Sequence, residues 1–453
     1  MTDSDIDSWY YLMLAAWIVG PAMLFALHSR RNMLPGVILY SYLFGLFMGH
    51  WMGALVHGLP GHSFFDSKDT VEGFKLSTYG LLALLLGALL VPTRVYTSRG
   101  GCNAAEYNRK LRETAKMCLL LGVLAWLAFY TPVAQLPSAS SLLSAGKQCM
   151  LLGICLFCWV CWQERRMWQF RMWIALSLLL PVITIVTSGF IGYGITMVGT
   201  ILVFVAMFYR PRWVILVGLL ASIYAGMSLW VVYAASRDEI RGSVWGGQDL
   251  SARGDALYKV WDNLGPIDFN NQDQLQHIDN RLNQNSLIGA AIRTTPDLVP
   301  FLYGETVLAA VAAIIPRAIW PDKPASGGSG KYASQQTMIE FAEGTSVGLG
   351  QVLEFYINYG VPGVIVGFLL LGMALRWIDI GFVNALQNGN IEGCVVFFLL
   401  GSGAVQPGGS LSEAVAAVGG GVMLAFLINR YFRYMSRRRA MGRLRKLEGR
   451  GRR

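Results

Sequence analysis

Long, nearly uncharged apolar runs recur along the whole chain, and they restrict its fold more than any other feature of the sequence. Two of them read "YGLLALLLGALLV" and "ILVGLLASIYAGMSLWVVYAA". A run of about 18 or more apolar residues is long enough for a helix to cross a bilayer. Only 14% of the residues are charged, whereas soluble domains carry about 25%. The pattern therefore predicts an all-α, polytopic helical membrane bundle.

Hydropathy predicts about eleven spans, with one large outer loop between the eighth and the ninth. The predicted spans cover residues 9–28, 34–58, 75–95, 117–135, 148–163, 172–188, 193–209, 213–234, 353–378, 391–407 and 412–432. They divide the chain into an N-terminal membrane bundle (1–234), the outer loop (235–350), a C-terminal membrane bundle (351–432) and a basic tail (433–453). A connection as long as this loop is usually functional or a folded insert.

The charges of the connections alternate along the chain. Most of the 37 Lys and Arg fall on one side, in "HSRRN", the 94–116 loop, "ERRMWQFR", "RPR", at Arg376 and in the tail, whereas most of the 27 Asp and Glu fall on the other. Cytoplasmic loops are the ones rich in Lys and Arg. We therefore expect the N-terminus outside, the C-terminus in the cytoplasm and the large loop outside. The start "MTDSDID" lacks a basic region, so the first span is expected to be retained.

The large loop contains an unusual stretch, "IIPRAIWPDKPASGG". The apolar run before Pro316 is too short to span a bilayer, which favours a helix that lies at the interface or re-enters it. Trp320 suits the headgroup level, and Arg317, Asp322 and Lys323 would be presented there. Arg offers a bidentate fork for a phosphate, and Lys a point charge. The alternative is that these cations only touch ordinary anionic lipids.

The second predicted span carries two histidines and three regularly spaced glycines. Gly45, Gly49 and Gly53 follow a small-xxx-small pattern, which is typical of a helix-packing face. His50 and His57 share a face of the same span. Polar groups inside a membrane suggest function, and a buried hydrogen-bonding role explains them equally well.

The segments "RLNQN", "AAIRTTP", "YGETV", "IIPRAIWPDKP" and "GLGQVLEFYINYGVPG", in this order, resemble the Wzy-type polymerases of bacterial O-antigen and exopolysaccharide. The resemblance covers roughly residues 280–365 and rests on a "PRxxWPxKP" element followed by an acidic–aromatic element, here Glu354 to Gly360. It implies a GT-C-like bundle in the bacterial inner membrane that joins undecaprenyl-diphosphate-linked oligosaccharide repeat units. The implied partners are this lipid-linked glycan, membrane lipids and a chain-length regulator protein, with no nucleic acid.

Such a reaction needs particular groups at the outer membrane face. No ATP is available there, so the energy arrives in the sugar–diphosphate bond, and cations must stabilise the charge of the departing diphosphate. Arg317 is the first candidate, assisted by Lys323, with Arg281 and Arg293 on the preceding segment. Glu354 either orients an Arg or accepts the proton of the acceptor hydroxyl.

The remaining candidates would contact the substrate. Asp322 is expected to orient a cation, Arg241 can equally be an interface anchor, and His277 can be a base or simply solvated. The full predicted substrate-binding set is Asp322, Trp320, Tyr356, Asn358, Arg241 and His277. No Cys or His pair has metal-ligand spacing and no "DxD" pair lies in an outer loop, so we expect a reaction without metal or cofactor.

Three other functions remain open. A ligase that transfers a finished glycan would share the loop and its cations. A flippase or transporter usually shows internal repeats and sites at mid-membrane, whereas here the polar candidates gather in one outer loop. A scaffold that binds anionic lipid through its basic tail would leave the "PRAIWPDKP" stretch without a role.

Overall fold

The computed structural model describes residues 8–28, 36–59, 67–92, 104–128, 131, 139–188, 191–210, 212–235, 258, 262, 265–315, 320, 329–341 and 348–450. Within these ranges the regular secondary structure is helical, with no strand. The elements are α1 (Ser8–His28), α2 (Val37–Leu46), the π-helix η1 (Phe47–Trp51), α3 (Met52–His57), α4 (Ser67–Leu90), α5 (Ala104–Ala128), α6 (Ala139–Gln163), α7 (Met167–Ser177), α8 (Leu180–Ser188), α9 (Gly192–Ala206), α10 (Arg212–Ala235), α13 (Gln272–Leu282), α14 (Gln284–Thr294), α15 (Glu305–Ala313), α16 (Ser329–Thr337), α17 (Gln351–Gln387), α18 (Ile391–Ala404) and α19 (Leu411–Arg450).

Eight helical segments among the described residues are long and apolar enough to cross a membrane, and two shorter apolar helices, α9 and α18, lie among them. Large apolar side chains are exposed along several of these helices, including Trp9 and Ile18 of α1 and Leu216 and Leu220 of α10. Apolar surface of this extent suits lipid rather than water. The protein is therefore an all-α, polytopic helical membrane protein, as the sequence predicts.

Every predicted span corresponds to helix, but some boundaries differ. The helix expected over 117–135 is α5, which begins at Ala104, so that the charged run "RKLRETAK" is helical rather than a loop. The span expected over 172–188 is interrupted at Leu178 and Leu179, between α7 and α8. Pro181 lies at the start of α8, where its missing N–H costs no helical hydrogen bond.

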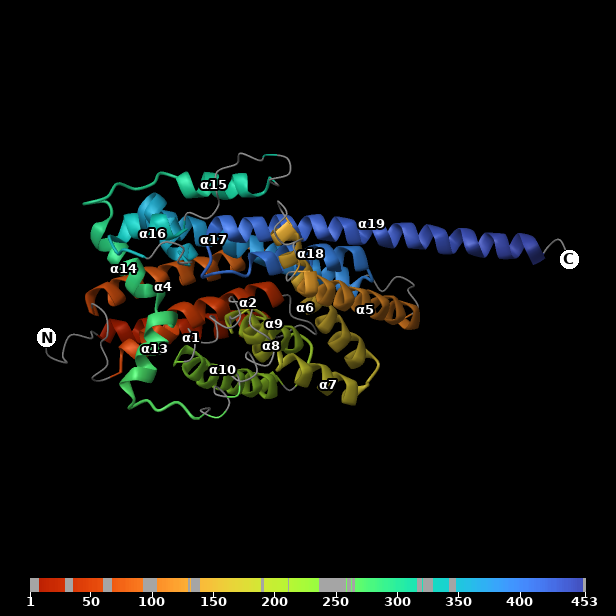
Figure 1. The fold of residues 1–453 in the computed structure, drawn as a ribbon, viewed down its shortest axis with the longest axis horizontal. Coiled ribbons are helices and arrows are strands. Elements are labelled where there is room, and N and C mark those ends of the chain that lie inside the picture. The colour runs from red at the N-terminus through yellow and green to blue at the C-terminus, as the bar shows by residue number, and fades with distance from the viewer. Residues whose placement is uncertain are drawn as a thin grey trace.

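The long helices lie side by side in the bundle (Figure 1), and they approach each other closely where glycine leaves out a side chain. A Cβ on Gly87 of α4 would lie 2.1 Å from the carbonyl oxygen of Leu369 in α17, and one on Gly372 would lie 2.1 Å from that of Leu84. Only glycine allows backbones to approach this closely, as is common between membrane helices. On its other side α4 packs on α1, where Trp17 donates to Thr78 at 3.0 Å.

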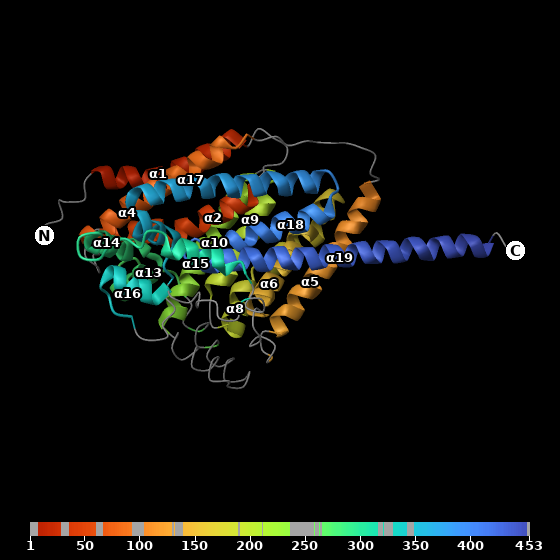
Figure 2. The ribbon, with the colours of Figure 1, turned by 90° about the horizontal axis from the view of Figure 1, so that it is seen from above.

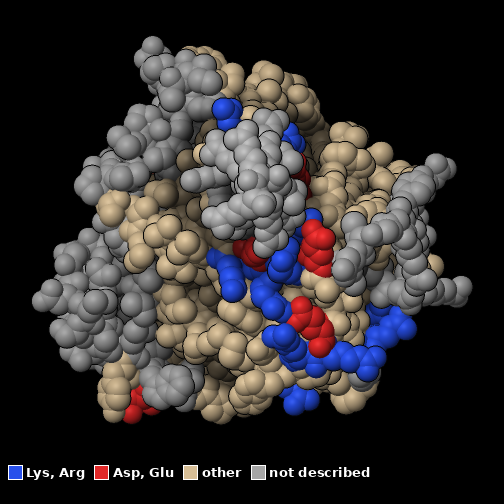
Figure 3. Space-filling model, turned by 90° about the vertical axis from the view of Figure 1, so that its right-hand side faces the viewer, with Lys and Arg blue, Asp and Glu red and all other residues tan. Residues whose placement is uncertain are grey.

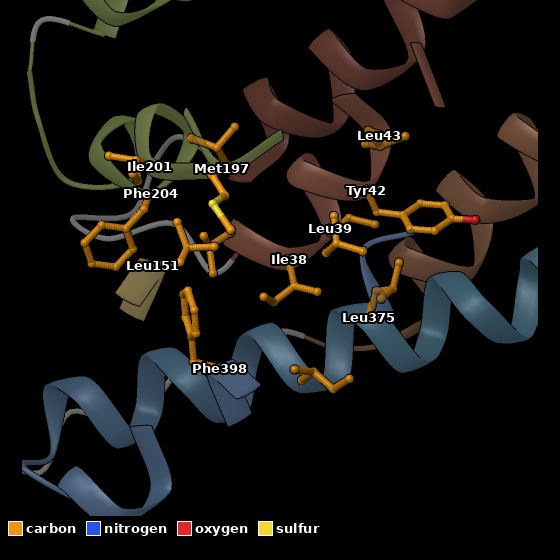
Figure 4. Close-up of a cluster of buried hydrophobic side chains, with 14 of the residues drawn as sticks. Ile38, Leu39, Tyr42, Leu43, Leu151, Met197, Ile201, Phe204, Leu375 and Phe398 are labelled. Carbon is orange, nitrogen blue, oxygen red and sulfur yellow. The ribbon is translucent and has the colours of Figure 1, made fainter. Parts of the chain in front are cut away.

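The apolar core of the bundle forms around α2 (Figure 4). Ile38, Leu39 and Tyr42 are fully buried. Beside them lie Phe204 of α9, Phe398 of α18 and Leu375 of α17. Because α2 is covered on all sides, it is the central helix of the molecule and not a lipid-facing one.

Helix α17 is sharply bent near its beginning, where Tyr359 and Gly360 have non-helical dihedral angles. A Cβ on Gly363 would lie 2.6 Å from the carbonyl oxygen of Phe355, although residues eight apart in a straight helix are about 12 Å apart. The rings of Phe355 and Phe368 meet edge to face at 5.7 Å. The chain therefore folds back on itself, and residues 351–358 form a short first segment before the long one, instead of the single span expected over 353–378.

The long segment of α17 carries two fully buried charged residues. Asp379 accepts hydrogen bonds from the backbone N–H groups of Ile38 and Leu39 at 2.8 and 2.9 Å. It thereby caps the first turn of α2, where a carboxylate is favoured. Arg376 lies within electrostatic range of Asp379 and is 0% exposed. The prediction that Arg376 belongs to a basic connection is wrong, because α17 continues to Gln387 and buries it.

The described part of the large loop lies against the bundle as four helices, α13 to α16 (Figures 1 and 2). Helix α14 crosses the first turns of α4, where Gly73 and Gly289 bring the two backbones together. Helix α15 contacts α19, and Ile314, just after α15, lies beside Gly419. Since α19 is a candidate span from Leu411 onward, α15 runs beside a membrane helix, which favours the re-entering arrangement over one flat on the interface.

Candidate functional site

Three elements meet around the carboxylate of Glu354, in the first segment of α17. Its Oε2 accepts a hydrogen bond from the backbone N–H of Leu411 at 2.6 Å, and the hydroxyl of Thr306 also bonds to the carboxylate. Thr306 lies in the first turn of α15, and Leu411 begins α19. Glu354 is 2% exposed. We call this convergence of α15, α17 and α19 the Glu354 junction.

Asn358, one turn further along α17, holds the junction together. Its Oδ1 accepts from the backbone N–H of Gly304 at 2.9 Å. Its Nδ2 donates to Thr306 Oγ1 at 2.7 Å and to the carbonyl oxygen of Glu354 at 2.6 Å. Both amide protons are therefore used within the protein. Asn358 is fully buried, so it positions α15 against α17 and has no donor left for a substrate, contrary to the predicted binding role.

Tyr356 also makes a buried contact within the protein. Its hydroxyl donates to the carbonyl oxygen of Thr295 at 2.9 Å. The Thr295 side chain in turn donates to Oε1 of Gln336 in α16 at 2.8 Å. Tyr356 thus connects the first segment of α17 to α16, and the structure gives it a positioning role rather than the predicted substrate contact.

The two predicted loop cations that the structure describes, Arg281 and Arg293, lie on the surface. Arg293, at the end of α14, is half exposed and pairs with Asp69 of α4 at 3.0 Å. Arg281, at the end of α13, is exposed and interacts electrostatically with Tyr193, which is also within range of Glu413. Of the two arginines, Arg281 lies toward the side of the Glu354 junction where α19 begins. Arg293 is held at α4 by its ion pair with Asp69.

Of the other predicted site residues, the structure describes only two. His277 is half buried on α13, and Trp320 is 42% exposed. Arg317, Lys323, Asp322 and Arg241 lie outside the described residues.

The start of α19 was not singled out from the sequence, although a local signal was present. In "SLSE", Ser410 Oγ accepts from the backbone N–H of Glu413 at 3.2 Å, and Glu413 Oε2 accepts from that of Ser410 at 3.3 Å. This reciprocal pair is a capping box, recognisable from Ser/Thr followed three residues later by Glu. That Glu354 adds a second carboxylate contact at this helix end could not be read from sequence, because 57 positions separate it from Leu411.

The fully buried His50 belongs to a polar network between spans and loop. Its Nδ1 lies 3.0 Å from Oδ1 of Asn285 and 3.2 Å from the hydroxyl of Ser77. Asn285 Nδ2 donates to the carbonyl oxygen of His50 at 2.8 Å. His50 lies in the π-helix η1, and such turns often occur at functional sites. Of the two interpretations of His50, the network supports the hydrogen-bonding one.

Asp279 of α13 is another buried carboxylate that was not singled out from the sequence. Asn283 Nδ2 donates to its Oδ1 at 2.9 Å, while Oδ2 has no partner among the described residues. Burial raises the pKa of Asp279 to about 6, and the hydrogen bond from Asn283 opposes this shift. A carboxyl group in this position is protonated more readily than an exposed one.

The fold and the site define a polytopic helical membrane protein in which a loop folded against the bundle meets two membrane helices at a buried carboxylate. The chain belongs to the family described as Domain of unknown function (DUF8712), whose model matches residues 68–407 of the 453. The match includes α14, α15 and the first segment of α17, and it ends just before α19 begins. No curated protein and no solved structure matches the chain.

Proposed function

We propose that this protein is a polymerase that joins undecaprenyl-diphosphate-linked oligosaccharide repeat units into a cell-surface polysaccharide, at the outer face of the bacterial inner membrane. The observation that carries the proposal is the Glu354 junction. It combines a buried carboxylate, a loop helix beside a membrane span, and apolar side chains of α15 that are open to lipid, namely Leu308 and Val311. A lipid-linked sugar needs both a polar reaction centre and an apolar approach for its carrier.

In this proposal Glu354 acts on the acceptor sugar. Among the described residues no Lys or Arg forms an ion pair with it, so the role of proton acceptor is favoured over that of orienting an Arg. The acceptor hydroxyl attacks the anomeric carbon of the growing chain and gives its proton to Glu354. The bond from that carbon to the diphosphate breaks, and the diphosphate leaves with its charge. Arg317, Lys323 and Arg281 would stabilise that charge.

The distribution of charge supports the proposed orientation. Lys and Arg gather on the end of the bundle shown in Figure 3. Several pair there with acids at the start of α5, the end of α6 and the start of α18, namely Lys110 with Glu106, Arg112 with Glu164, Arg166 with Glu164 and Arg433 with Glu392. A basic end is expected in the cytoplasm, which would leave helices α13 to α16 on the outer side.

The test of this function is the glycan that accumulates when the gene is deleted. We expect single repeat units on the lipid carrier, exposed at the outer face and accessible to a lectin in spheroplasts. Long lipid-linked chains would instead indicate a ligase, and units facing the cytoplasm a flippase. Either result would contradict the proposal.

Reconstitution then tests the reaction itself. Purified protein in liposomes, given those lipid-linked units and a chelator, should produce a ladder whose rungs differ by one repeat unit. Glu354→Gln should reduce the rate about 10²- to 10⁴-fold, which is the usual contribution of a general base. The matched control is Glu340→Gln, because Glu340 is exposed on the same loop. A ladder of normal rate from Glu354→Gln would remove Glu354 from the reaction.

A further inference from the structure

Gln284, the first residue of α14, lies where three backbone segments converge. Gly49 of η1, Gly350 before α17 and Gly408 between α18 and α19 all face its side chain. A Cβ on Gly350 would lie 2.8 Å from Oε1 of Gln284, and one on Gly408 would lie 2.9 Å from Nε2. Any other residue at these two positions would displace the amide, so the glycines keep this amide at the meeting point of loop and membrane helices.

The side-chain amide of Gln284 has no hydrogen-bond partner among the residues that the structure describes. Its side chain is also only half buried, so a ligand could reach the amide. The neighbouring amide of Gln351 differs in both respects. Gln351 is 2% exposed, accepts from the hydroxyl of Tyr42 at 2.5 Å and donates to the carbonyl oxygen of Gln406 at 3.3 Å. Buried polar groups are normally paired, and an accessible unpaired amide at such a crowded place offers two donors and one acceptor to a ligand.

A second amide of this kind is close by. The side chain of Gln406, two residues before Gly408, is half buried and also lacks a partner among the described residues. Its backbone carbonyl is held by Gln351. The loop between α18 and α19 therefore presents its side chain from a fixed backbone.

The surroundings indicate a neutral ligand rather than an anion. Two backbone N–H groups at these helix starts are already used within the protein, since that of Gln351 donates to the carbonyl oxygen of Pro407 at 3.0 Å and that of Leu411 donates to Glu354. Glu354 and Glu413 add two carboxylates, against one described cation, Arg281, in electrostatic range of the same region. Amides next to carboxylates suit the hydroxyl groups of a sugar.

We infer that Gln284 and Gln406 form a subsite for the hydroxyl groups of the acceptor glycan. The subsite lies one helical turn from the reaction centre, because Gly350, which touches Gln284, accepts from the backbone N–H of Glu354 at 3.0 Å. This inference rests on the proposed function, and it assigns the acceptor sugar to the junction between α14, α17 and the α18–α19 loop.

Binding of a soluble glycan tests the subsite without requiring polymerisation. The probe is the set of oligosaccharide fragments released from the cell's own surface polysaccharide by partial acid hydrolysis, titrated calorimetrically into the full-length protein in nanodiscs. Gln284→Met keeps the length and packing of the side chain and removes its hydrogen bonds. We expect about tenfold weaker binding, corresponding to the loss of one or two hydrogen bonds, and a smaller loss for Gln406→Met.

Gln276→Met is the matched control, because Gln276 is exposed on neighbouring α13; it should bind as wild type does. Equal binding by wild type and Gln284→Met would overturn the subsite and leave the polymerase proposal standing. Absence of wild-type binding together with a normal ladder would also overturn the subsite. Wild-type binding that Gln284→Met weakens, without any ladder from wild type, would support the subsite and contradict the polymerase.

Discussion

At the scale of single residues, polar side chains near the junction separate by how fully their hydrogen bonds are satisfied. Asn358 uses both donors and an acceptor inside the protein, and Gln351 is likewise paired. Gln284 is not. Residue type alone does not distinguish these amides, because the distinction depends on partners far away in sequence. Replacing a fully paired amide, such as that of Asn358, should therefore destabilise the fold. Replacing the unpaired amide of Gln284 should instead weaken ligand binding.

Asn358→Ala should destabilise the protein strongly. The substitution removes the acceptor of the Gly304 N–H and the amide donor to Thr306 Oγ1, both in a buried place. We expect the free energy of unfolding to fall by about 2–4 kcal/mol, since each buried group left unpaired costs about 1–3 kcal/mol. Unfolding in detergent measures this, with Asn280→Ala as control because Asn280 is exposed. A change below about 0.5 kcal/mol, typical of surface sites, would contradict the role assigned to Asn358.

Asp279 should make the docking of α13 sensitive to pH. Its pKa is raised from 3.8 to about 6, so the folded state binds a proton more tightly than the unfolded state does. The docked helix is therefore most stable below about pH 4 and loses stability as the pH rises through 6. Hydrogen exchange of residues 272–282 between pH 4 and 7 should show this loss. In Asp279→Asn the slope should disappear, and a slope that persisted would assign the effect to another group.

At the scale of elements, the elbow of α17 determines where the junction lies. Gly360 has φ 63° and ψ −155°, a combination that essentially only glycine adopts. The turn allows Phe355 to pack on the second segment and brings Glu354 beside α15 and α19. A straight helix over the same residues would carry Glu354 away from Thr306.

Gly360→Ala should disrupt this elbow. A Cβ there would be strained by the backbone angles and would approach the ring of Phe301 to 3.2 Å. We expect a loss of about 1–3 kcal/mol in unfolding free energy, the usual magnitude for such strain, together with loss of polymer. The control is Gly218→Ala in α10, where a Cβ meets nothing within 4 Å and should stabilise the helix by about 0.5–1 kcal/mol. Equal stability of both variants would show that the elbow tolerates a side chain.

At the scale of the whole molecule, the two ends of the bundle differ in charge and in structure. One end carries the basic surface of Figure 3. Toward the opposite end lie α13, α14 and α16 (Figure 1). Charge and loop structure thus distinguish the two ends independently, and both are consistent with the proposed orientation.

Reporter fusions test that orientation. A reporter fused near Gln272, at the start of α13, should be active outside the cytoplasm, whereas fusions after Arg112 and after Arg439 should be active inside. The expected asymmetry follows from the preference of Lys and Arg for the cytoplasmic side. A cytoplasmic signal at Gln272 would place the Glu354 junction on the side where ATP is available and would contradict the proposed reaction.

The sequence by itself determined the all-α membrane class, the positions of most spans and the presence of one long, functionally distinctive loop between two sets of spans. Apolar runs of span length have few folded alternatives, because an unpaired backbone is too costly in lipid. The family resemblance carried by "EFYINYG" also singled out Glu354, Tyr356 and Asn358. Short-range signals were sufficient for these conclusions.

Only the tertiary structure decided what those residues do. The elbow at Gly360, the burial of Arg376 beside Asp379, and the contacts of Glu354 with Thr306 and Leu411 all join distant segments. Arg376 was counted with the basic connections, although it falls within the span expected over 353–378, because a count of charges along the sequence cannot register a buried partner such as Asp379. The same reason explains why Gln284 was overlooked: its significance lies in the partners it lacks, which only the packing of three other segments around it reveals.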